Sequence, residues 1–466
     1  MARTPDEYIA SLRDGREVWY RGVRVPSIAE HPVLSIAARH LAKLYGMGDR
    51  LYHDSELGSI SKYYKIPRGS EDLLERHKMI YKHTYECNGI FNIGQAIGSD
   101  AFFALMIVSK KIDAKYKTNY YERVINYYKY IVKNDLSVAV AQTDVKGDRS
   151  KRPHEQRDPD LYVRIVDVKS DGIIVRGAKA HTTQAAVSDE IIVIPTRAMT
   201  PKDSDYAVAF AIPANTKGLK MVVRPIDEVE GNSSAVLSRM DYELETLTIF
   251  DNVFVPWDRV FMFREHEFAG LLANLFATYH RFTAVSYRSA MANLYLGAAS
   301  LAAKANGVFE APHIRSRIIE IILWKEIMRM GAIASAVNPI VDEGIAIPNP
   351  LYTNIAKLYS NTSFSKVLEA LVDIVGGIVS TLPSEEDLRG ELGDLIAKYL
   401  AGAVDGKERI AILKIAKELA GSSLAGYTLG LMIHAEGSAE ASRIGLAREY
   451  NLSEAEDLVK RILGNI

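Results

Sequence analysis

A histidine, a tyrosine and an arginine lie close together in one apolar helical stretch, ATYHRFTAVSYRSAM. At helical spacing His280, Ala284, Tyr287 and Arg288 fall on one face, so an imidazole, a phenol and a guanidinium can point into one cleft. An imidazole beside a cation is suited to general-base catalysis. The carboxylate of Glu245, just before the strand pattern IFDNVFVP, is a second catalytic candidate. A structural role for the histidine and a solvent-facing position for the glutamate are the alternatives that spacing leaves open.

A turn-forming stretch, AQTDVKGDR, carries backbone donors, short hydroxyl groups and cations between a helical pattern and a strand pattern. Gly147 permits close approach of the backbone, and Lys146 and Arg149 can neutralise a phosphate or polarise a ring oxygen. This combination favours an anionic cofactor. A charged loop that forms its own salt bridges is the alternative.

A second polar stretch interrupts an apolar strand pattern in IIVRGAKAHTTQAAVSDEIIVIPT. His181, Thr182, Thr183 and Gln184 separate two apolar runs, and polar groups inside a core need partners. A bound ligand would supply these partners, and a tight hairpin with ordered water would do so equally well.

Composition limits the function classes. At 466 residues, with 48% hydrophobic and 25% charged residues, the chain can bury a large core in two or three domains. A net charge of −1 without a dense basic run argues against nucleic acid and anionic lipid as partners, and small molecules are expected instead. The sequence has no signal-peptide pattern and no apolar stretch of membrane-spanning length, so we expect a cytoplasmic protein. Rossmann, P-loop, HExxH and EF-hand motifs are missing.

The chain has one cysteine, Cys87. One cysteine excludes an intramolecular disulfide and a cysteine-built zinc or iron–sulfur site within one chain. We predict a buried apolar side chain at this position rather than a nucleophile.

The apolar periodicity changes twice along the chain. Residues 1–136 show apolar positions three and four apart, which predicts an all-helical N-terminal domain. Residues 137–264 show short strand patterns separated by turn residues, which predicts an antiparallel β-barrel or sandwich. Residues 265–466 contain four long helical patterns, the last being ERIAILKIAKELAGSSLAGYTLGLMI, which predicts a four-helix bundle. This α+β order is the layout of the acyl-CoA dehydrogenase architecture, in which a flavin lies between the β domain and the bundle.

Two adjacent glycines, Gly376 and Gly377, end one of the bundle helices in LEALVDIVGGIVS. A helix C-cap is the simpler interpretation. A diglycine would also let a cofactor's pyrophosphate approach the backbone.

Five stretches carry a family resemblance over nearly the whole chain: AQTDVKGDRSKRPHEQRDPDLYVRIVDVKSDGIIVRGAKAHTTQ, IFDNVFVPWDRVF, FAGLLANLFATYHR, VDIVGGIVSTLPSEED and IHAEGSAEASRI. They resemble the 4-hydroxybutyryl-CoA dehydratase/vinylacetyl-CoA isomerase branch of the 4-hydroxyphenylacetate 3-hydroxylase family. The resemblance implies an acyl-CoA dehydrogenase fold, bound FAD, and a homotetramer whose flavin sites border subunit interfaces. It implies flavin contacts from Gln142, Thr143, Lys146, Gly147, Asp148, Arg149, Gln156, His181, Thr182 and Thr183, and from Gly376 and Gly377 toward the flavin of a neighbouring subunit.

The chain departs from this branch where the dehydratases hold an iron–sulfur cluster on three cysteines and one histidine. The cysteine positions align with Asn92, Ala96 and Tyr287, and the histidine aligns with His280. Oxygen and nitrogen side chains do not replace such thiolates, so we expect no iron–sulfur cluster and no other metal.

Two further positions differ from the resembled enzymes. A lysine that follows the last cluster cysteine is Arg288 here, which keeps the charge but removes a titrating amine. The phenol hydroxylases place arginine and tyrosine at the positions of Asn92 and Ala96, and this chain has neither.

Three functional hypotheses follow. Without a cluster, dehydration loses its Lewis acid, whereas proton abstraction beside a thioester needs a base, an oxyanion contact and the flavin. The leading hypothesis is therefore an FAD-binding enzyme that isomerises a short acyl-CoA such as vinylacetyl-CoA, with His280 as the base. The second is an FADH2-dependent monooxygenase of an aromatic substrate, supplied by a separate flavin reductase. The third is a catalytically silent subunit that assembles with a cluster-bearing paralogue.

Overall fold

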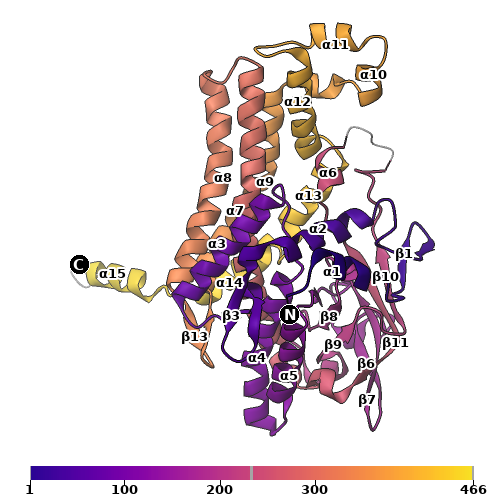
Figure 1. The fold of residues 1–466 in the computed structure, drawn as a ribbon. Coiled ribbons are helices and arrows are strands. Elements are labelled where there is room, and N and C mark those ends of the chain that lie inside the picture. Colours follow the sequence, from indigo (N-terminus) through magenta and orange to yellow (C-terminus); the bar gives the residue numbers. More distant parts are fainter. Residues whose placement is uncertain (1, 231–234, 464–466) are drawn as a thin grey trace.

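A computed structural model describes residues 2–230 and 235–463, with a β region beside a long helical bundle (Figure 1). The N-terminal helices are α1 (Pro5–Ser11), α2 (Ser35–Gly46), α3 (Ser70–Glu86), α4 (Ala96–Tyr116) and α5 (Tyr120–Lys133). None of the helices in the described ranges is both long enough and apolar enough to cross a bilayer.

The N-terminal region also contains four short strands, so the prediction of an all-helical first third was wrong. They are β1 (Val18–Tyr20), β2 (Val23–Val25), β3 (Leu51–Asp54) and β4 (Gly58–Ser61). The run VWYRGVRV is rich in β-branched and aromatic residues, and Arg21 and Gly22 both take positive φ, which suits a two-residue hairpin turn.

The central strands form two sheets rather than one closed barrel within the described ranges. One sheet has the order β2-β1-β10-β11-β7-β6 and the other β12-β9-β8-β5. Phe210 and Phe250 pack edge to face between the two sheets, with ring centroids 5.9 Å apart. The strands are β5 (Val138–Ala141), β6 (Arg164–Val168), β7 (Gly172–Lys179), β8 (Glu190–Val193), β9 (Val208–Pro213), β10 (Leu219–Val223), β11 (Thr246–Pro256) and β12 (Val260–Phe263).

The sheets are mixed, because β1 pairs with β10 and β5 pairs with β8 in parallel. The purely antiparallel arrangement that we predicted is therefore corrected. The parallel pairs arise because β1 belongs to the N-terminal region and because a crossover through β6 and β7 separates β5 from β8.

The C-terminal region is built on three long helices, α7 (His266–Ala305), α8 (Pro312–Val337) and α9 (Pro350–Val375). Trp324 of α8 and Phe364 of α9 pack together in the core with ring centroids 5.2 Å apart. A small hairpin, β13 (Ile340–Asp342) and β14 (Ile345–Ile347), joins α8 to α9. The shorter helices are α6 (Leu237–Met240), α10 (Glu385–Arg389), α11 (Gly393–Tyr399), α12 (Gly406–Ala420), α13 (Ser423–His434), α14 (Ala439–Glu449) and α15 (Ser453–Leu463).

The fourth predicted bundle helix is broken into α12 and α13. Gly421 ends α12, and the Ser422 hydroxyl accepts a hydrogen bond from the Leu424 N–H to start α13. A glycine followed by a serine N-cap is a stop-and-start signal that outweighs the continuous apolar periodicity. The break turns the chain so that α13 and α14 pack against α9.

Candidate active site

His280 lies in the middle of α7 and is held by Asp100 of α4. The His280 Nδ1 lies 3.1 Å from Asp100 Oδ2, and the imidazole stacks on Phe276 with ring centroids 5.2 Å apart. Asp100 also accepts hydrogen bonds from Arg76 at 2.7 Å and from the Thr283 hydroxyl at 3.1 Å. Asp100 thus accepts hydrogen bonds on both carboxylate oxygens, and its Oδ2 fixes the orientation of the imidazole through Nδ1.

No other described residue bonds to the His280 Nε2, and the side chain is 11% exposed. The Asp–His pair therefore presents an oriented imidazole whose Nε2 has no partner among the described residues, the arrangement that a general base requires. We had not identified Asp100 from the sequence, although an acidic residue in the apolar helix AIGSDAFFALM is a signal in itself.

Arg288 and Tyr287 do not extend into an open cleft as we predicted from their helical spacing. The Arg288 guanidinium is fully buried and donates to Glu436 at 2.6 Å, and the Tyr287 hydroxyl donates to the same carboxylate at 2.7 Å. Arg288 also donates to Ser360 and to the Met432 carbonyl. Both side chains therefore bind a carboxylate from the α13–α14 junction, which helical periodicity alone does not reveal.

Glu436 is the centre of this buried network. Its carboxylate also lies 3.5 Å from Lys357 Nζ. Despite burial, the charges of Arg288, Lys357 and His280 lower the pKa of Glu436 to about 2. Burial, followed by the charge of Arg288, lowers the pKa of the Lys357 ammonium well below its usual value. We had not named Glu436 or Lys357 as site residues, although Glu436 lies in the family-like stretch IHAEGSAEASRI.

Glu243 and Glu245 lie in the chain that leads directly into β11. The Glu245 Oε1 accepts from Thr183 at 2.8 Å, while its Oε2 and the Glu243 Oε1 are buried without a hydrogen-bond partner. Burial raises the pKa of Glu245 to about 7, and burial with the charge of Glu245 raises the pKa of Glu243 well above its usual value. Burial therefore favours the protonated form of both carboxyl groups, and the Glu245 carboxyl beside Thr183, with a pKa of about 7, is about half protonated at neutral pH.

The buried Glu245 carboxyl makes a prediction for stability against pH. Its folded-state pKa of about 7 exceeds the ordinary value of 4.5, so the folded chain binds the extra proton between these pH values. The free energy of unfolding should fall by about 3 kcal/mol as pH rises from 4.5 to 7. In urea unfolding, the Glu245→Gln variant should not show this loss of stability between pH 4.5 and pH 7. An identical pH dependence in wild type and variant would contradict the raised pKa of Glu245.

The loop 142–149 is fixed by a buried ion pair and by one glutamine. The Lys179 ammonium lies 2.7 Å from Asp144 Oδ1 and also donates to the Gln142 carbonyl at 2.8 Å. The Gln156 amide accepts from the Asp148 N–H and donates to the Asp148 carbonyl, both at 2.9 Å. We predicted Gln156 as a flavin contact. In the structure its side chain holds the loop through hydrogen bonds to the Asp148 backbone.

Gly147 is the tightest point of this loop. Its φ is +54°, and a Cβ there would lie 2.4 Å from Gln156 Oε1 and 3.1 Å from the Tyr162 hydroxyl. Lys146, Asp148 and Arg149 flank it with exposed side chains. The loop therefore combines a glycine packed tightly against Gln156 with exposed charges, and its contact with a cofactor stays a prediction.

The second predicted stretch lies next to this loop, since the Ala180 N–H donates to the Thr143 carbonyl at 2.8 Å. His181 has a positive φ of 53°, and burial with the charge of Lys146 lowers the pKa of its imidazole. The Thr182 hydroxyl is buried without a hydrogen-bond partner. A polar ligand seated here would satisfy that hydroxyl.

Gly376 and Gly377 lie at the end of α9 that carries α10 and α11, away from the sheets (Figure 1). Gly376 ends α9 with a φ of +79°, and a Cβ on either glycine would meet nothing within 4 Å. The helix-cap interpretation therefore holds for Gly376. Within the chain itself, the two glycines are not brought together with the loop 142–149.

The positions aligned with cluster cysteines do not fit an iron–sulfur cluster. Asn92 donates from its amide to the His40 carbonyl at 2.7 Å, Ala96 begins α4, and the Tyr287 ring stacks on Phe91 at 4.6 Å. An amide, a methyl group and a phenol cannot supply the thiolate ligands that bind the iron atoms of such a cluster.

Cys87 is buried, as predicted, and burial raises the pKa of its thiol to about 12. Its neighbours His40 and Asp241 are already committed to each other. The His40 Nδ1 lies 2.8 Å from Asp241 Oδ1 and its Nε2 lies 3.0 Å from the Phe91 carbonyl oxygen, so both ring nitrogens have partners. Lys43 and Asn88 also donate to the Asp241 carboxylate.

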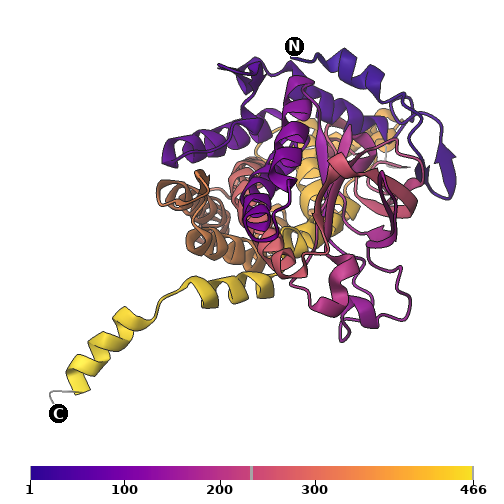
Figure 2. The same cartoon turned by 90° about the horizontal axis from the view of Figure 1, so that it is seen from below.

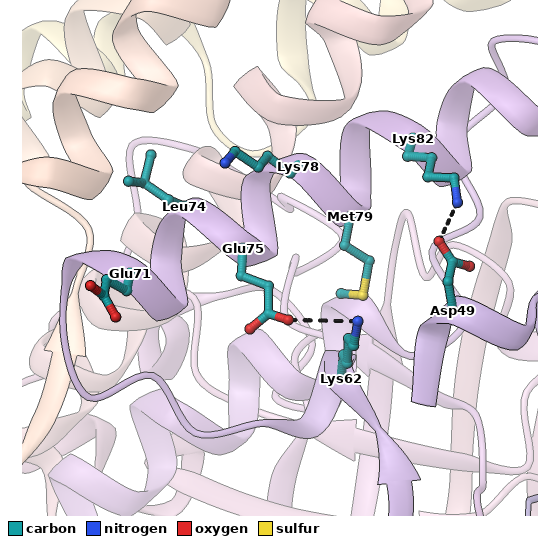
Figure 3. A pocket seen from close by; sticks show the side chains of 8 residues that line it. All are labelled: Asp49, Lys62, Glu71, Leu74, Glu75, Lys78, Met79 and Lys82. Carbon is teal, nitrogen blue, oxygen red and sulfur yellow. Dashed lines mark hydrogen bonds and ion pairs between the residues drawn. The ribbon is translucent and has the colours of Figure 1, made fainter. Parts of the chain in front are cut away.

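A surface groove runs along the outer face of α3, apart from this site (Figure 3). Its charged residues pair across the groove, Lys82 with Asp49 and Lys62 with Glu75. These surface pairs satisfy four of the six charged side chains that line the groove.

Comparison with known proteins gives a consistent result. The family model for the N-terminal part of 4-hydroxyphenylacetate 3-hydroxylase matches residues 4–262, and the model for its C-terminal part matches residues 269–464. The 4-hydroxybutyryl-CoA dehydratase/vinylacetyl-CoA-Δ-isomerase of Clostridium aminobutyricum is 34% identical over 496 residues, covering 100% of both chains. The 4-hydroxyphenylacetate 3-monooxygenase oxygenase component of Thermus thermophilus is 30% identical over 92% of this chain and 89% of the relative.

Solved structures agree with these sequence matches. An oxygen-tolerant archaeal 4-hydroxybutyryl-CoA dehydratase from N. maritimus superposes with a TM-score of 0.93 at 32% identity, over 100% of this chain and 95% of that chain. The oxygenase component of 4-hydroxyphenylacetate 3-monooxygenase in complex with FAD superposes with a TM-score of 0.91 at 28% identity, over 99% and 98%.

Proposed function

The chain belongs to the 4-hydroxyphenylacetate 3-hydroxylase family of enzymes, and on that premise we propose that it is a cluster-free, FAD-binding isomerase of a short acyl-CoA. The reaction moves one proton from C2 to C4 of a vinylacetyl-type thioester, with no net change in oxidation state. The observation that carries the proposal is the Asp100–His280 pair, in which the imidazole is oriented through Nδ1 and Nε2 has no partner among the described residues.

FAD fits the residues present. The loop around Gly147, the unsatisfied Thr182 hydroxyl and the charged side chains of Lys146 and Arg149 offer close backbone approach, a donor and two cations. The proposed flavin side of the site also includes Gln142, Thr143, Asp148, His181 and Thr183. Gln156 supports it through its hydrogen bonds to the Asp148 backbone. When bound, the flavin supplies an electron-accepting ring system beside the substrate.

In this proposal His280 and its partners carry out the proton transfers. His280 takes the C2 proton at Nε2, and Asp100 stabilises the resulting imidazolium through Nδ1. A protonated Glu245, with its free Oε2, donates a hydrogen bond to the substrate oxygen as negative charge develops there. The imidazolium then returns the proton to C4. Tyr287 and Arg288 bind the Glu436 carboxylate and so hold the α13–α14 junction against α7, the helix that carries His280.

The assembly proposed for the active enzyme is a homotetramer in which Gly376 and Gly377 approach the flavin of a neighbouring subunit. Their open backbone at the end of α9 supports this role, since nothing would contact an added Cβ there.

Proton exchange tests the proposed function. FAD-loaded enzyme incubated with crotonyl-CoA in D2O should incorporate deuterium at C2 and C4, which mass spectrometry and NMR will locate. Absence of exchange at both carbons, together with no conversion of vinylacetyl-CoA to crotonyl-CoA, would reject the isomerase.

A second candidate function is an FADH2-dependent monooxygenase of an aromatic substrate, working with a separate reductase. The support is that relatives such as the Thermus thermophilus protein are named as oxygenase components, and that one solved relative holds FAD and 4-hydroxyphenylacetate. Oxygen consumption by the reduced enzyme that depends on an aromatic substrate and yields a hydroxylated product would favour this function.

The proposed flavin loop gives a direct mutational prediction. Gly147→Ala should weaken FAD binding at least about tenfold, because the new Cβ displaces Gln156 and strains a positive φ. Fluorescence titration with FAD measures the effect. Gly22→Ala is the matched control, since Gly22 has a φ of +78° but open space around it. Equal FAD affinity in wild type and Gly147→Ala would remove this loop from the cofactor site.

A further inference from the structure

Cationic and imidazole side chains from four segments of the chain gather around the proposed flavin loop. We call them the cationic cluster, and its members are Lys146, Arg149, His181, Arg197 and His434. All of them are exposed except Arg197, which is partly exposed, so the cluster opens to solvent. The proposed flavin site includes three of these residues and gives no role to Arg197 and His434.

Arg197 follows β8 and is fixed beside the loop 142–149 by its neighbour Thr196. The Thr196 hydroxyl accepts a hydrogen bond from the Asp144 N–H at 3.2 Å. The same hydroxyl donates to the Gln142 carbonyl at 2.5 Å. The position of Arg197 is therefore set by the backbone of the loop.

Tyr162 connects Arg197 to Lys146. The Arg197 guanidinium carbon lies 6.0 Å from the centroid of the Tyr162 ring, and the Tyr162 hydroxyl donates to the Lys146 carbonyl. Burial lowers the pKa of the Lys146 ammonium, and the charges of Arg149 and Arg197 lower it further. These cations therefore lie close enough to repel one another.

His434 is the last residue of α13, which lies between the long bundle helices and the β region (Figures 1 and 2). On the same helix the Tyr427 hydroxyl lies 3.5 Å from Glu245 Oε1. His434 lies about two turns, or roughly 10 Å, further along the same face. Burial lowers the pKa of the His181 imidazole, and the charges of Lys146 and His434 lower it further, so His434 lies on the side of the loop.

The cationic cluster has no counter-charge in the parts of the chain that the structure describes, because none of its members forms an ion pair there. Asp144 of the loop pairs with Lys179 at 2.7 Å. Asp148 lies 3.7 Å from the ammonium of Lys151. Unpaired cations of one sign around an opening concentrate anions, and arginine matches the geometry of a phosphate group.

The charge of the cluster exceeds what a flavin alone would neutralise. FAD brings one diphosphate, for which Lys146 and Arg149 of the loop are sufficient. A coenzyme A thioester brings a second diphosphate and a separate 3′-phosphate. Its pantetheine arm can span the interval between Glu245, the proposed contact of the thioester oxygen, and His434. An aromatic substrate without phosphate groups would leave Arg197 and His434 unpaired.

We propose, on the premise of the acyl-CoA substrate of the proposed function, that Arg197 and His434 bind phosphate groups of the coenzyme A part of that substrate. The two residues thereby select coenzyme A thioesters over thioesters that lack the nucleotide. Lys146 and Arg149 remain with the flavin.

Equilibrium binding to the full-length, FAD-loaded protein tests this role without requiring turnover. The ligands are butyryl-CoA, which has no double bond to isomerise, and butyryl-pantetheine, which lacks the diphosphate and the 3′-phosphate. In titration calorimetry the wild type should bind butyryl-CoA at least about a hundredfold more tightly than butyryl-pantetheine. Arg197→Met and His434→Ala should each weaken butyryl-CoA binding by about tenfold and leave butyryl-pantetheine binding and FAD affinity unchanged.

Two control variants accompany these. Arg197→Lys keeps the charge and should retain most of the affinity for butyryl-CoA. Arg24→Met removes an exposed arginine of β2 and should bind both ligands as the wild type does.

The outcomes separate the phosphate site from the reaction. Wild-type affinity for butyryl-CoA in Arg197→Met and His434→Ala would overturn the site, and so would a loss of FAD affinity alone, which would assign both residues to the flavin. Isomerisation of vinylacetyl-CoA together with equal affinity for the two ligands would keep the isomerase and overturn the site. Phosphate-dependent binding that requires Arg197, without isomerisation, would keep the site and reject the isomerase.

Discussion

Replacing His280 with alanine is expected to lower the turnover of vinylacetyl-CoA by about 10²–10⁴-fold while FAD stays bound. The imidazole is the group whose proton position is fixed by a buried carboxylate, with Nδ1 bonded to Asp100 and Nε2 left open. Its loss removes the proposed base but leaves the loop 142–149 and its ion pair intact. Steady-state kinetics and the flavin absorbance of the purified variant measure the two effects separately.

His266→Ala provides the matched control, since His266 begins the same helix. That variant should keep wild-type turnover. The turnover of Asp100→Asn should lie between those of His280→Ala and His266→Ala. The amide would no longer fix the tautomer of the imidazole or stabilise the imidazolium with a negative charge. Wild-type turnover in His280→Ala would remove the imidazole from the mechanism.

Replacing Glu436 with glutamine is expected to lower the free energy of unfolding by about 3–5 kcal/mol at neutral pH, because Arg288 would remain buried without a compensating charge. The pKa of Glu436, about 2 against an ordinary 4.5, gives a contribution of about 3 kcal/mol. A carboxyl with a lowered pKa stabilises the fold above pH 4.5, and this part is lost as pH falls toward 2. Urea unfolding at pH 7 and at lower pH measures both.

Two variants sharpen this result. Glu440→Gln removes an exposed carboxylate from the neighbouring helix and should change stability by no more than about 0.5 kcal/mol. Adding Arg288→Met to Glu436→Gln should recover part of the loss, because the unpaired buried cation is then gone. A loss below about 1 kcal/mol in Glu436→Gln would show that Arg288 has another counter-charge.

Local patterns predicted the elements well where one signal dominated. The long helices α7, α8 and α9 follow their apolar periodicity, and the burial of Cys87 follows from the usual preference of a free cysteine for the protein interior. The strands β1 and β2 were missed because three-residue strands lie below the length at which periodicity is informative. The break at Gly421 was missed because apolar spacing continued through a helix stop signal.

The site was harder to predict because its contacts join distant parts of the chain. Spacing along α7 correctly grouped His280, Tyr287 and Arg288 on one helix, but their partners Asp100 and Glu436 lie 180 and 148 or more residues away. A buried cation requires a counter-charge, so an arginine in an apolar helix predicts a partner without identifying it. Only the packing of α4 and of the α13–α14 junction against α7 identifies them.

The central claim is that the enzyme moves a proton without an iron–sulfur cluster. Purified, FAD-reconstituted protein should be incubated without oxygen with vinylacetyl-CoA and, in parallel, with 4-hydroxybutyryl-CoA, while chromatography follows crotonyl-CoA. We predict that crotonyl-CoA forms from vinylacetyl-CoA alone. Formation from both substrates would contradict the argument from the missing thiolates, and formation from neither would contradict the isomerase itself.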